Sequence, residues 1–352
     1  MAQASGRQAV DESTLRLNFE SIMPNPNLST FSPAELVPSS QTERTRFGRD
    51  VIAGLRQEAR RLSPKYFYDV AGSALFDRIC ELPEYYPTRT EIGILRDNAK
   101  AIAEVVGPNA EVVEFGAGSL TKIRLLFDAF AAGEAPLRYM PVDISGEHLH
   151  MAARRLQAEY PALQIQPVVA DYTMPLILPK AAADSGKRVG FFPGSSLGNF
   201  QPDEALEFLR LAARLLQGGG LLVGVDLVKA PAVLHAAYND DQGVTAAFNL
   251  NLLRRMNAEL AADFDLNGFA HYAFYQAARQ RVEMHLVSKL RQTVRIGEER
   301  FDFAEGDSIL TEESHKFTVD SFRALAAAAG FSPGPVWIDE QRLFSVHWLV
   351  VR

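Results

Sequence analysis

Two glycines and a lysine follow a short apolar run in VVEFGAGSLTK, which spans residues 112–122. An apolar strand followed by G-x-G forms the first strand-to-helix turn of many nucleotide-binding proteins, because glycine lets the backbone approach the ligand closely. A dinucleotide site needs a third Gly or Ala where this chain has Thr121, and the P-loop pattern GxxxxGK[ST] is absent. Gly116 and Gly118 therefore predict a ligand without a pyrophosphate, and Lys122 predicts a positive charge near it.

Two acids extend this pattern along the chain. Asp143 ends the next apolar run, MPVDIS, and Asp171 ends the one after it, VVADY. Beside a glycine turn, Asp143 can accept from both hydroxyls of a ribose, and Asp171 from an adenine amino group against which Tyr172 packs. Singly, such acids are turn formers or helix caps. Together they predict a site for S-adenosylmethionine (SAM), whose carboxylate would lie near Lys122, as in class I SAM-dependent methyltransferases.

The elements that must position these residues alternate regularly. From 111 to 227, apolar runs of strand length alternate with amphipathic segments such as SLTKIRLLFDAFAA and PDEALEFLRLAARLLQ. This alternation predicts an α/β fold, a Rossmann-like doubly wound parallel sheet covered on both faces, with right-handed crossovers. Residues 317–331 predict a further helix, and PVWIDE and FSVHWLVV predict two final strands.

A second set of elements interrupts this sheet. Residues 42–62 predict an amphipathic helix, and residues 230–262 predict helices around the loop YNDDQG. Residues 282–296 alternate like a half-buried antiparallel pair. We expect three parts: a flexible N-terminal arm over 1–40, a smaller α+β substrate-binding domain from 41–90 plus 229–315, and a SAM-binding methyltransferase domain from 91–228 plus 316–352.

The composition limits the class of protein. Hydrophobic residues make up 47% and charged residues 22% of the 352 residues, as in ordinary globular proteins. The net charge of −7 gives no reason to expect binding to nucleic acid or to an anionic membrane. Cys80 is the only cysteine, and His and Cys show no metal-binding spacing. We expect a cytoplasmic protein, because the first twenty residues also lack the apolar centre of a signal peptide. We also expect a monomer that needs no metal.

Four stretches carry a resemblance to a known family. They are YDVAGSALFDRICELPEYYPTRTE (68–91), EFGAGSLTK (114–122), FFPGSSLGNF (191–200) and AAYNDDQGVTAAFNLNLL (236–253). In these motifs the chain resembles the L-histidine Nα-methyltransferases of ergothioneine biosynthesis and their fungal relatives that methylate prenylated tryptophan. The likeness runs from about residue 45 to the C-terminus. It implies a two-domain enzyme that uses SAM to methylate the α-amine of free L-histidine three times, giving the betaine hercynine.

The resemblance also implies the residues that bind substrate. Tyr68 and Glu312 would hold the imidazole, with Ser314 two residues after the glutamate, while Asn199 and Tyr238 would hold the backbone end of the amino acid. Three further positions would line the pocket: Gly194, Tyr85 and Met284. A carboxylate beside a hydroxyl suits the N–H and the lone-pair nitrogen of imidazole. No catalytic residue is assigned: the transfer is expected to proceed in line by proximity, and the acceptor of the amine proton stays open.

Three other functions stay open from the residues. The acceptor can be another aromatic amino acid, such as tryptophan or a derivative, although a carboxylate facing a second ring nitrogen has no use for indole. The acceptor can be a protein or nucleic acid, which the acidic charge disfavours. The chain can also be a non-catalytic SAM-binding protein, in which case degraded SAM motifs would be expected.

Overall fold

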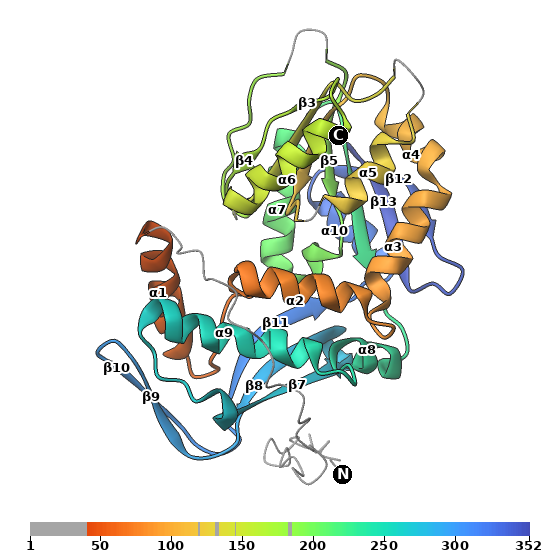
Figure 1. The fold of residues 1–352 in the computed structure, drawn as a ribbon. Helices are drawn as coiled ribbons and strands as arrows, with labels where there is room; N and C mark the ends of the chain where they lie inside the picture. The colour runs from red at the N-terminus through yellow and green to blue at the C-terminus, as the bar shows by residue number, and fades with distance from the viewer. Residues whose placement is uncertain (1–40, 119, 131–133, 145, 182–184) are drawn as a thin grey trace, which may run out of the picture. The chain divides into compact units, whose positions relative to one another are not determined.

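The computed structural model describes residues 41–118, 120–130, 134–144, 146–181 and 185–352 (Figure 1). The arm expected over 1–40 lies outside these residues. The α-helices are α1 (Gln41–Leu55), α2 (Val70–Glu81), α3 (Tyr86–Asp97), α4 (Ala99–Val106), α5 (Thr121–Phe127), α6 (Gly146–Glu159), α7 (Pro202–Leu215), α8 (Pro231–Tyr238), α9 (Val244–Leu260) and α10 (Val319–Ala328). Short 3₁₀ turns are η4 (Pro64–Phe67), η5 (Ser196–Asn199), η6 (Leu266–Gly268) and η7 (Ala277–Arg279).

The strands fall into three sheets. The largest has the order β12-β13-β6-β5-β1-β2-β3, with β4 also paired to β2. Its strands are β1 (Glu111–Phe115), β2 (Arg138–Asp143), β3 (Gln164–Ile165), β4 (Val168–Val169), β5 (Arg188–Phe192), β6 (Gly220–Asp226), β12 (Phe331–Ile338) and β13 (Phe344–Val351). The smaller sheets are β11-β8-β7 and β10-β9, built from β7 (Phe269–Gln276), β8 (Arg281–Ser288), β9 (Gln292–Ile296), β10 (Glu299–Phe303) and β11 (Ser308–His315).

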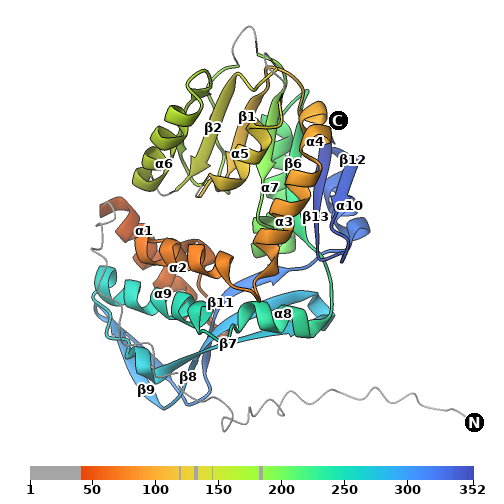
Figure 2. The same cartoon turned by 45° about the vertical axis from the view of Figure 1, so that its right-hand side comes forward.

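The large sheet confirms the predicted α/β class. Strand β1 pairs in parallel with both β2 and β5, so the strand order reverses around it. The last strand, β13, runs antiparallel between β6 and β12. Neighbouring residues Val112 and Val113 are both fully buried, and they belong to different hydrophobic clusters on the two faces of the sheet. Figures 1 and 2 show the helices on both faces. Because both faces are covered, the central strand EVVEF is buried along its whole length.

The segments before α3 and after β6 share one hydrophobic core. Phe47 of α1 and Ile79 of α2 belong to the same cluster as Leu252 of α9 and Leu286 of β8. Helix α9 runs beside α2 and over the three-stranded sheet in both views (Figures 1 and 2). Segments far apart in the sequence therefore fold together.

The chain leaves the large sheet after β6 and returns to it at a single point. Leu227 and Phe317 form a parallel bridge. The Val228 amide donates to the Phe317 carbonyl at 2.9 Å, and the Phe317 amide donates to the Asp226 carbonyl at 3.0 Å. The segment that leaves the large sheet and the segment that returns to it are therefore hydrogen-bonded to each other.

Two expectations about local structure were wrong. The helix expected over 42–62 ends at Leu55, because the backbone turns so tightly that a Cβ on Gly54 would lie 2.0 Å from the Arg61 carbonyl oxygen. Leu62 is buried, but its amide donates to the carbonyl of Leu310 in β11. The pair expected within 282–296 is also absent: β8 pairs with β7 and β11, and β9 pairs with β10.

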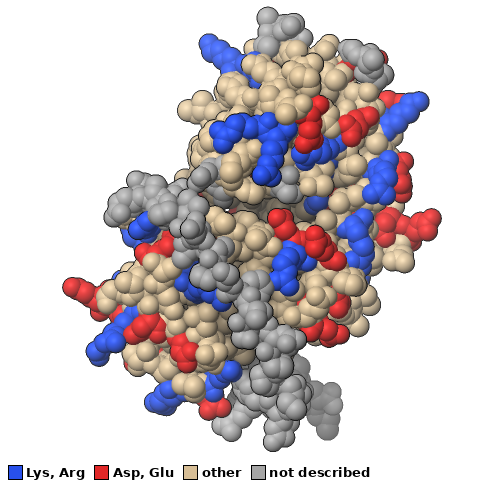
Figure 3. All heavy atoms as spheres, viewed as in Figure 1, with Lys and Arg blue, Asp and Glu red and all other residues tan. Residues whose placement is uncertain are grey.

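Charged side chains of both signs are interspersed on the face of the molecule shown in Figure 3. Some pair at the surface, as Arg56 does with Glu299 at 2.7 Å and Arg295 with Asp263 at 3.0 Å. Among the helices of the described residues, none is both long enough and apolar enough to cross a bilayer.

Candidate active site

The glycine turn lies directly after β1, as predicted. Gly116 and Gly118 have φ angles of 68° and 49°, in the left-handed region that favours glycine. A Cβ on Gly116 would lie 3.4 Å from the Tyr172 side chain, so the ring of Tyr172 covers the turn. The Gly118 amide points to Asp143 at the end of β2, with 3.5 Å between the amide nitrogen and Oδ2. The structure therefore brings these four residues together.

Lys122 does not stand alone at the start of α5. Its Nζ lies 2.5 Å from Oε2 of Glu91, a carboxylate in α3 that is 1% exposed. The same carboxylate accepts from the Gly194 amide at 2.9 and 3.0 Å. Gly194 itself has a φ of 80°, another left-handed residue after β5. Glu91 therefore links the glycine turn to the loop after β5, and sequence reasoning had not given it a role.

Asp171 lies two residues beyond β4, and both of its oxygens are already engaged. Oδ2 is 2.9 Å from Arg46 of α1 and 3.8 Å from Lys65, while Oδ1 accepts from the Thr173 amide at 3.1 Å. Burial raises the pKa of Asp171, but the hydrogen bonds from Thr173 and the two cations outweigh burial and hold the pKa below its usual value. Asp171 is therefore ionised and also contacts elements outside the large sheet.

Glu312 lies in strand β11. Successive side chains on a strand point to opposite faces, so Glu312 and Glu313 point to opposite sides of the sheet. Glu313 forms ion pairs with Arg281 and, at 3.0 Å, with Arg61. Glu312 is 8% exposed and lies opposite Met284 of β8. No described residue forms a hydrogen bond or ion pair with its carboxylate, and burial raises its pKa to about 7, although Lys316 opposes this.

Aromatic rings enclose the space near Glu312. The ring of Tyr68 lies 5.6 Å from Phe76, and Tyr85 lies 6.5 Å from Tyr238. Burial, and then the charge of Glu312, raise the pKa of Tyr68 well above its ordinary value. The phenol is therefore protonated and can donate.

The remaining predicted residues gather where η5 meets β11. Tyr238 and Ser314 share a hydrogen bond of 2.9 Å, and both are buried. A Cβ on Gly198 would lie 2.7 Å from the His315 carbonyl oxygen, so η5 packs directly on the strand. Asn199 ends η5 half-buried, and its side-chain amide has no hydrogen-bond partner in the described part of the chain. Its donors are free for a ligand.

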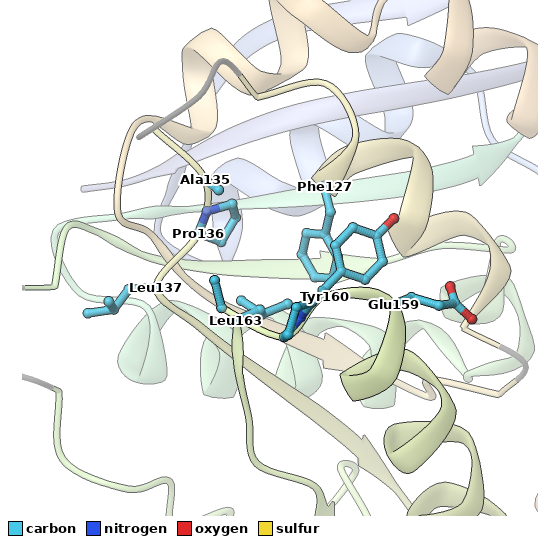
Figure 4. A pocket seen from close by; sticks show the side chains of 9 residues that line it. Phe127, Ala135, Pro136, Leu137, Glu159, Tyr160 and Leu163 are labelled. Atoms are coloured by element: carbon cyan, nitrogen blue, oxygen red, sulfur yellow. The ribbon is translucent and has the colours of Figure 1, made fainter.

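A separate cavity lies away from these residues. It measures about 430 Å³ and is lined by Phe127, Leu137, Tyr160 and Leu163 among others (Figure 4). Leu137 and Leu163 directly precede β2 and β3, so this cavity lies at the amino ends of the strands. The glycine turn, Asp143 and Asp171 lie at the carboxyl ends, where ligands bind in such sheets. The cavity has no part in the candidate site.

A buried charged network beside the site escaped the sequence analysis. Asp226 ends β6 and lies 2.5 Å from Lys229 and 2.8 Å from Lys316, and all three are almost fully buried. Tyr86 of α3 donates to Asp226 at 2.8 Å. The sequence could have pointed to Asp226, because it follows an apolar run in the same way as Asp143 and Asp171 do. No sequence pattern pointed to Lys316.

Comparison with known proteins gives consistent likenesses. Residues 47–351 match the family described as histidine-specific methyltransferase, SAM-dependent. The chain is 42% identical to a histidine N-alpha-methyltransferase of Mycolicibacterium smegmatis over 86% of this chain and 94% of that protein. It is 41% identical to the enzyme of the same name from Mycobacterium tuberculosis, over 83% and 91%. It is 30% identical to ergothioneine biosynthesis protein 1 of Neurospora crassa, over 79% of this chain and 32% of that longer protein.

Proposed function

The chain belongs to the SAM-dependent, histidine-specific methyltransferases, and from this premise we propose how its residues perform the reaction. The protein is an enzyme that transfers methyl groups from SAM to the α-amine of free L-histidine, a step of ergothioneine biosynthesis. We infer that three transfers occur on one nitrogen, giving hercynine. We also propose a cytoplasmic location, which the single cysteine supports, and a monomeric state.

The turn after β1 fits SAM. Both glycines are left-handed, and a Cβ on Gly118 would meet no atom beyond its chain neighbours closer than 4.0 Å, so its missing side chain leaves room above the backbone. Asp143 lies beside this turn, where its carboxylate would accept from the ribose hydroxyls. Lys122 would hold the methionine carboxylate, with Glu91 fixing its ammonium group. Asp171 would accept from the adenine amino group against which Tyr172 packs, exchanging part of its contact with Arg46.

The single observation that supports histidine as the acceptor is the Glu312 carboxylate. It is buried at 8% exposure without a partner among the described residues, which is costly for a charged group. An imidazole N–H would supply that partner, while the protonated Tyr68 would contact the same ring and Met284 would pack under it. An indole offers only its single N–H, so tryptophan or a derivative, the alternative acceptor, would use this edge less completely.

The other end of the substrate would be held by Asn199 and Tyr238. The Asn199 side-chain amide can donate to the carboxylate, and the Tyr238 hydroxyl, whose proton goes to Ser314, keeps a lone pair that can accept from the amine. Gly194 has no side chain to obstruct the ligand beside the loop after β5. Tyr85 would close the pocket on the side of α3, where its ring contacts Tyr238.

The chain's part in catalysis is to hold two reactants in line. When bound, SAM supplies a methyl group on a sulfonium, which needs no covalent intermediate with the protein. Asn199 and Tyr238 would hold the amino acid so that the amine lone pair points along the S–CH3 axis. Each transfer requires that the amine first lose a proton, and no side chain is assigned as the base.

We propose that substrate and SAM are bound by different parts of the chain. The hydrophobic cluster that joins α1 and α2 with α8, α9 and β7–β11 supports a substrate-binding domain from 41–90 plus 229–315. The two clusters on the faces of the large sheet support a SAM-binding domain from 91–228 plus 316–352. The proposed site lies where these two parts meet.

A product assay tests the function directly. The protein is incubated with SAM and each of the twenty free amino acids, and products are followed by mass. We expect a gain of three methyl masses on histidine alone. Product from tryptophan but not from histidine would overturn the choice of acceptor and leave the SAM site standing.

A pair of variants tests the role of Glu312. Glu312→Ala should weaken histidine binding by about 5- to 150-fold and leave binding of S-adenosylhomocysteine within about twofold, because an unmet imidazole N–H costs about 1–3 kcal/mol. Glu313→Gln is the matched control, since Glu313 is the next residue on the same strand and faces the opposite side. Equal losses for both ligands in Glu312→Ala would place Glu312 outside the histidine site.

A further inference from the structure

A buried lysine lies directly behind the proposed histidine site and has no role in the reaction described so far. Lys316 follows β11, and its side chain is 1% exposed. Asp226 supplies a counter-charge at 2.8 Å. Burial lowers the pKa of Lys316, but the Asp226 carboxylate outweighs burial and holds the pKa above its ordinary value. Lys316 is therefore a permanent cation inside the folded protein.

The three N–H bonds of this ammonium group have three acceptors. They are Oδ2 of Asp226 at 2.8 Å, Oγ of Ser314 at 2.8 Å and the hydroxyl oxygen of Tyr238 at 3.1 Å. An ammonium group has three donors and no lone pair, so it can only donate to these hydroxyls. Ser314 and Tyr238 therefore each give one lone pair to Lys316.

This arrangement fixes what Ser314 can offer to a ligand. Tyr238 donates its hydroxyl proton to Ser314 at 2.9 Å. A hydroxyl has two acceptor lone pairs and one proton. Both lone pairs of Ser314 are then filled, by Lys316 and by Tyr238, and only its proton remains. Toward the pocket, Ser314 is a donor and cannot accept.

Glu312 provides the complementary group on the same face of β11. It stands two residues before Ser314, a separation of roughly 6.8 Å along an antiparallel strand, and it can accept. Imidazole matches an acceptor and a donor only when one ring nitrogen carries a proton and the other does not. We propose that Lys316 is a positioning residue that fixes Ser314 as a donor, so that the site selects neutral imidazole in one tautomer. This inference rests on the proposed function of the site.

Lys229 offers a matched contrast within the same network. It lies 2.5 Å from Asp226, donates to the Tyr86 hydroxyl at 2.6 Å and also donates to the Leu227 carbonyl. It has no contact with Ser314 or Tyr238 among the interactions of the described residues. Both lysines therefore balance Asp226, but only Lys316 acts on the hydroxyls of the histidine site.

The protonation of bound histidine is measurable by NMR. L-histidine labelled with ¹⁵N at both ring positions is bound to the wild-type protein with S-adenosylhomocysteine. We expect one resonance of a protonated ring nitrogen and one of a bare ring nitrogen. Two protonated-type resonances, as in imidazolium, would overturn the inference, and so would two averaged resonances from exchanging tautomers.

Variants test whether Lys316 causes this selection. Lys316→Met should weaken histidine binding at least tenfold, leave S-adenosylhomocysteine binding within twofold and average the two ¹⁵N resonances. Lys316→Arg keeps the cation and should recover part of the histidine affinity. In a Ser314→Ala background, Lys316→Met should weaken binding by no more than about threefold further. An undiminished further loss would show that Lys316 does not act through Ser314.

Separate experiments test the role of Lys316 and the proposed function of the enzyme. Lys229→Met removes the other cation from Asp226 and should lower thermal stability while leaving histidine binding within twofold. Equal loss of histidine binding in both lysine variants would reduce Lys316 to a structural role and overturn the inference. Absence of any methylated histidine from the wild-type protein would instead overturn the proposed function, whichever result the variants give.

Discussion

Replacing Glu312 with glutamine should stabilise the ligand-free enzyme above pH 7 while it weakens histidine binding. The carboxyl has a pKa of 4.5 in an unfolded chain and about 7 in the folded protein, mainly because it is buried. Between these values the folded state holds a proton that the unfolded state has lost, so stability falls as pH rises. Above pH 7 the full cost is present. A shift of about 2.5 pH units corresponds to about 3 kcal/mol.

Glutamine at this position keeps the shape and never ionises. At pH 8, Glu312→Gln should therefore be more stable than wild type by up to about 3 kcal/mol, which raises Tm by about 6 °C at roughly 2 °C per kcal/mol. Near pH 4.5 both forms of the site are neutral, and the two melting temperatures should converge. Thermal unfolding of both proteins without ligands, at several pH values from 4.5 to 8, measures this gap.

The neighbouring acid provides the opposite control. Glu313 forms ion pairs with Arg281 and Arg61, so Glu313→Gln should lower Tm at pH 8. A Glu312→Gln protein that is less stable than wild type at pH 8 would refute the reasoning. A gap that stays the same at all pH values would also refute it, because the stabilisation would then not come from the carboxyl charge.

Three further perturbations follow from the contacts described. Glu91→Ala leaves the Lys122 cation without its partner and should cost about 3–5 kcal/mol of stability in urea unfolding; a change under 1 kcal/mol would contradict a buried ion pair. Gly116→Ala places a Cβ in the left-handed region and against Tyr172, so SAM should bind at least tenfold more weakly by calorimetry, at a stability cost of about 1–2 kcal/mol. Asp171→Ala should raise the KM for SAM at least tenfold with the KM for histidine little changed, and the reverse pattern in steady-state kinetics would assign Asp171 to the acceptor.

The sequence was sufficient for the large sheet and its glycine turn. Strand and helix periods between 111 and 227 are long and regular, and Gly116, Gly118 and Asp143 lie at strand ends where the pattern predicted them. The turn depends on left-handed backbone angles, and these favour glycine, so the spacing of the glycines predicts the turn. The same locality explains why the helices at 231–238 and 244–260 were also predicted.

The strands of the smaller sheets were less accessible to sequence reasoning. β11 contains TEES, and partners distant in sequence bury these polar residues. The strand therefore shows no alternation of hydrophobic and polar residues by which it could be predicted. Glu313 is buried because Arg281 pairs with it across the sheet. The role of Lys316 could not be predicted either, because it depends on Asp226, which is 90 residues earlier in the chain. Tertiary contacts of this kind leave no local pattern.

The paired chain segments at Leu227 and Phe317 have a consequence for how such enzymes can diversify. Residues 228–316 start and finish side by side on a short ladder, so both covalent connections of this segment to the large sheet lie at one place. Insertions attached in this way can be exchanged with little effect on the host fold. A different acceptor-binding segment grafted between Leu227 and Phe317 would keep the methyl donor site, provided that it also fits residues 41–90 and brings a cation to replace Lys316 beside Asp226.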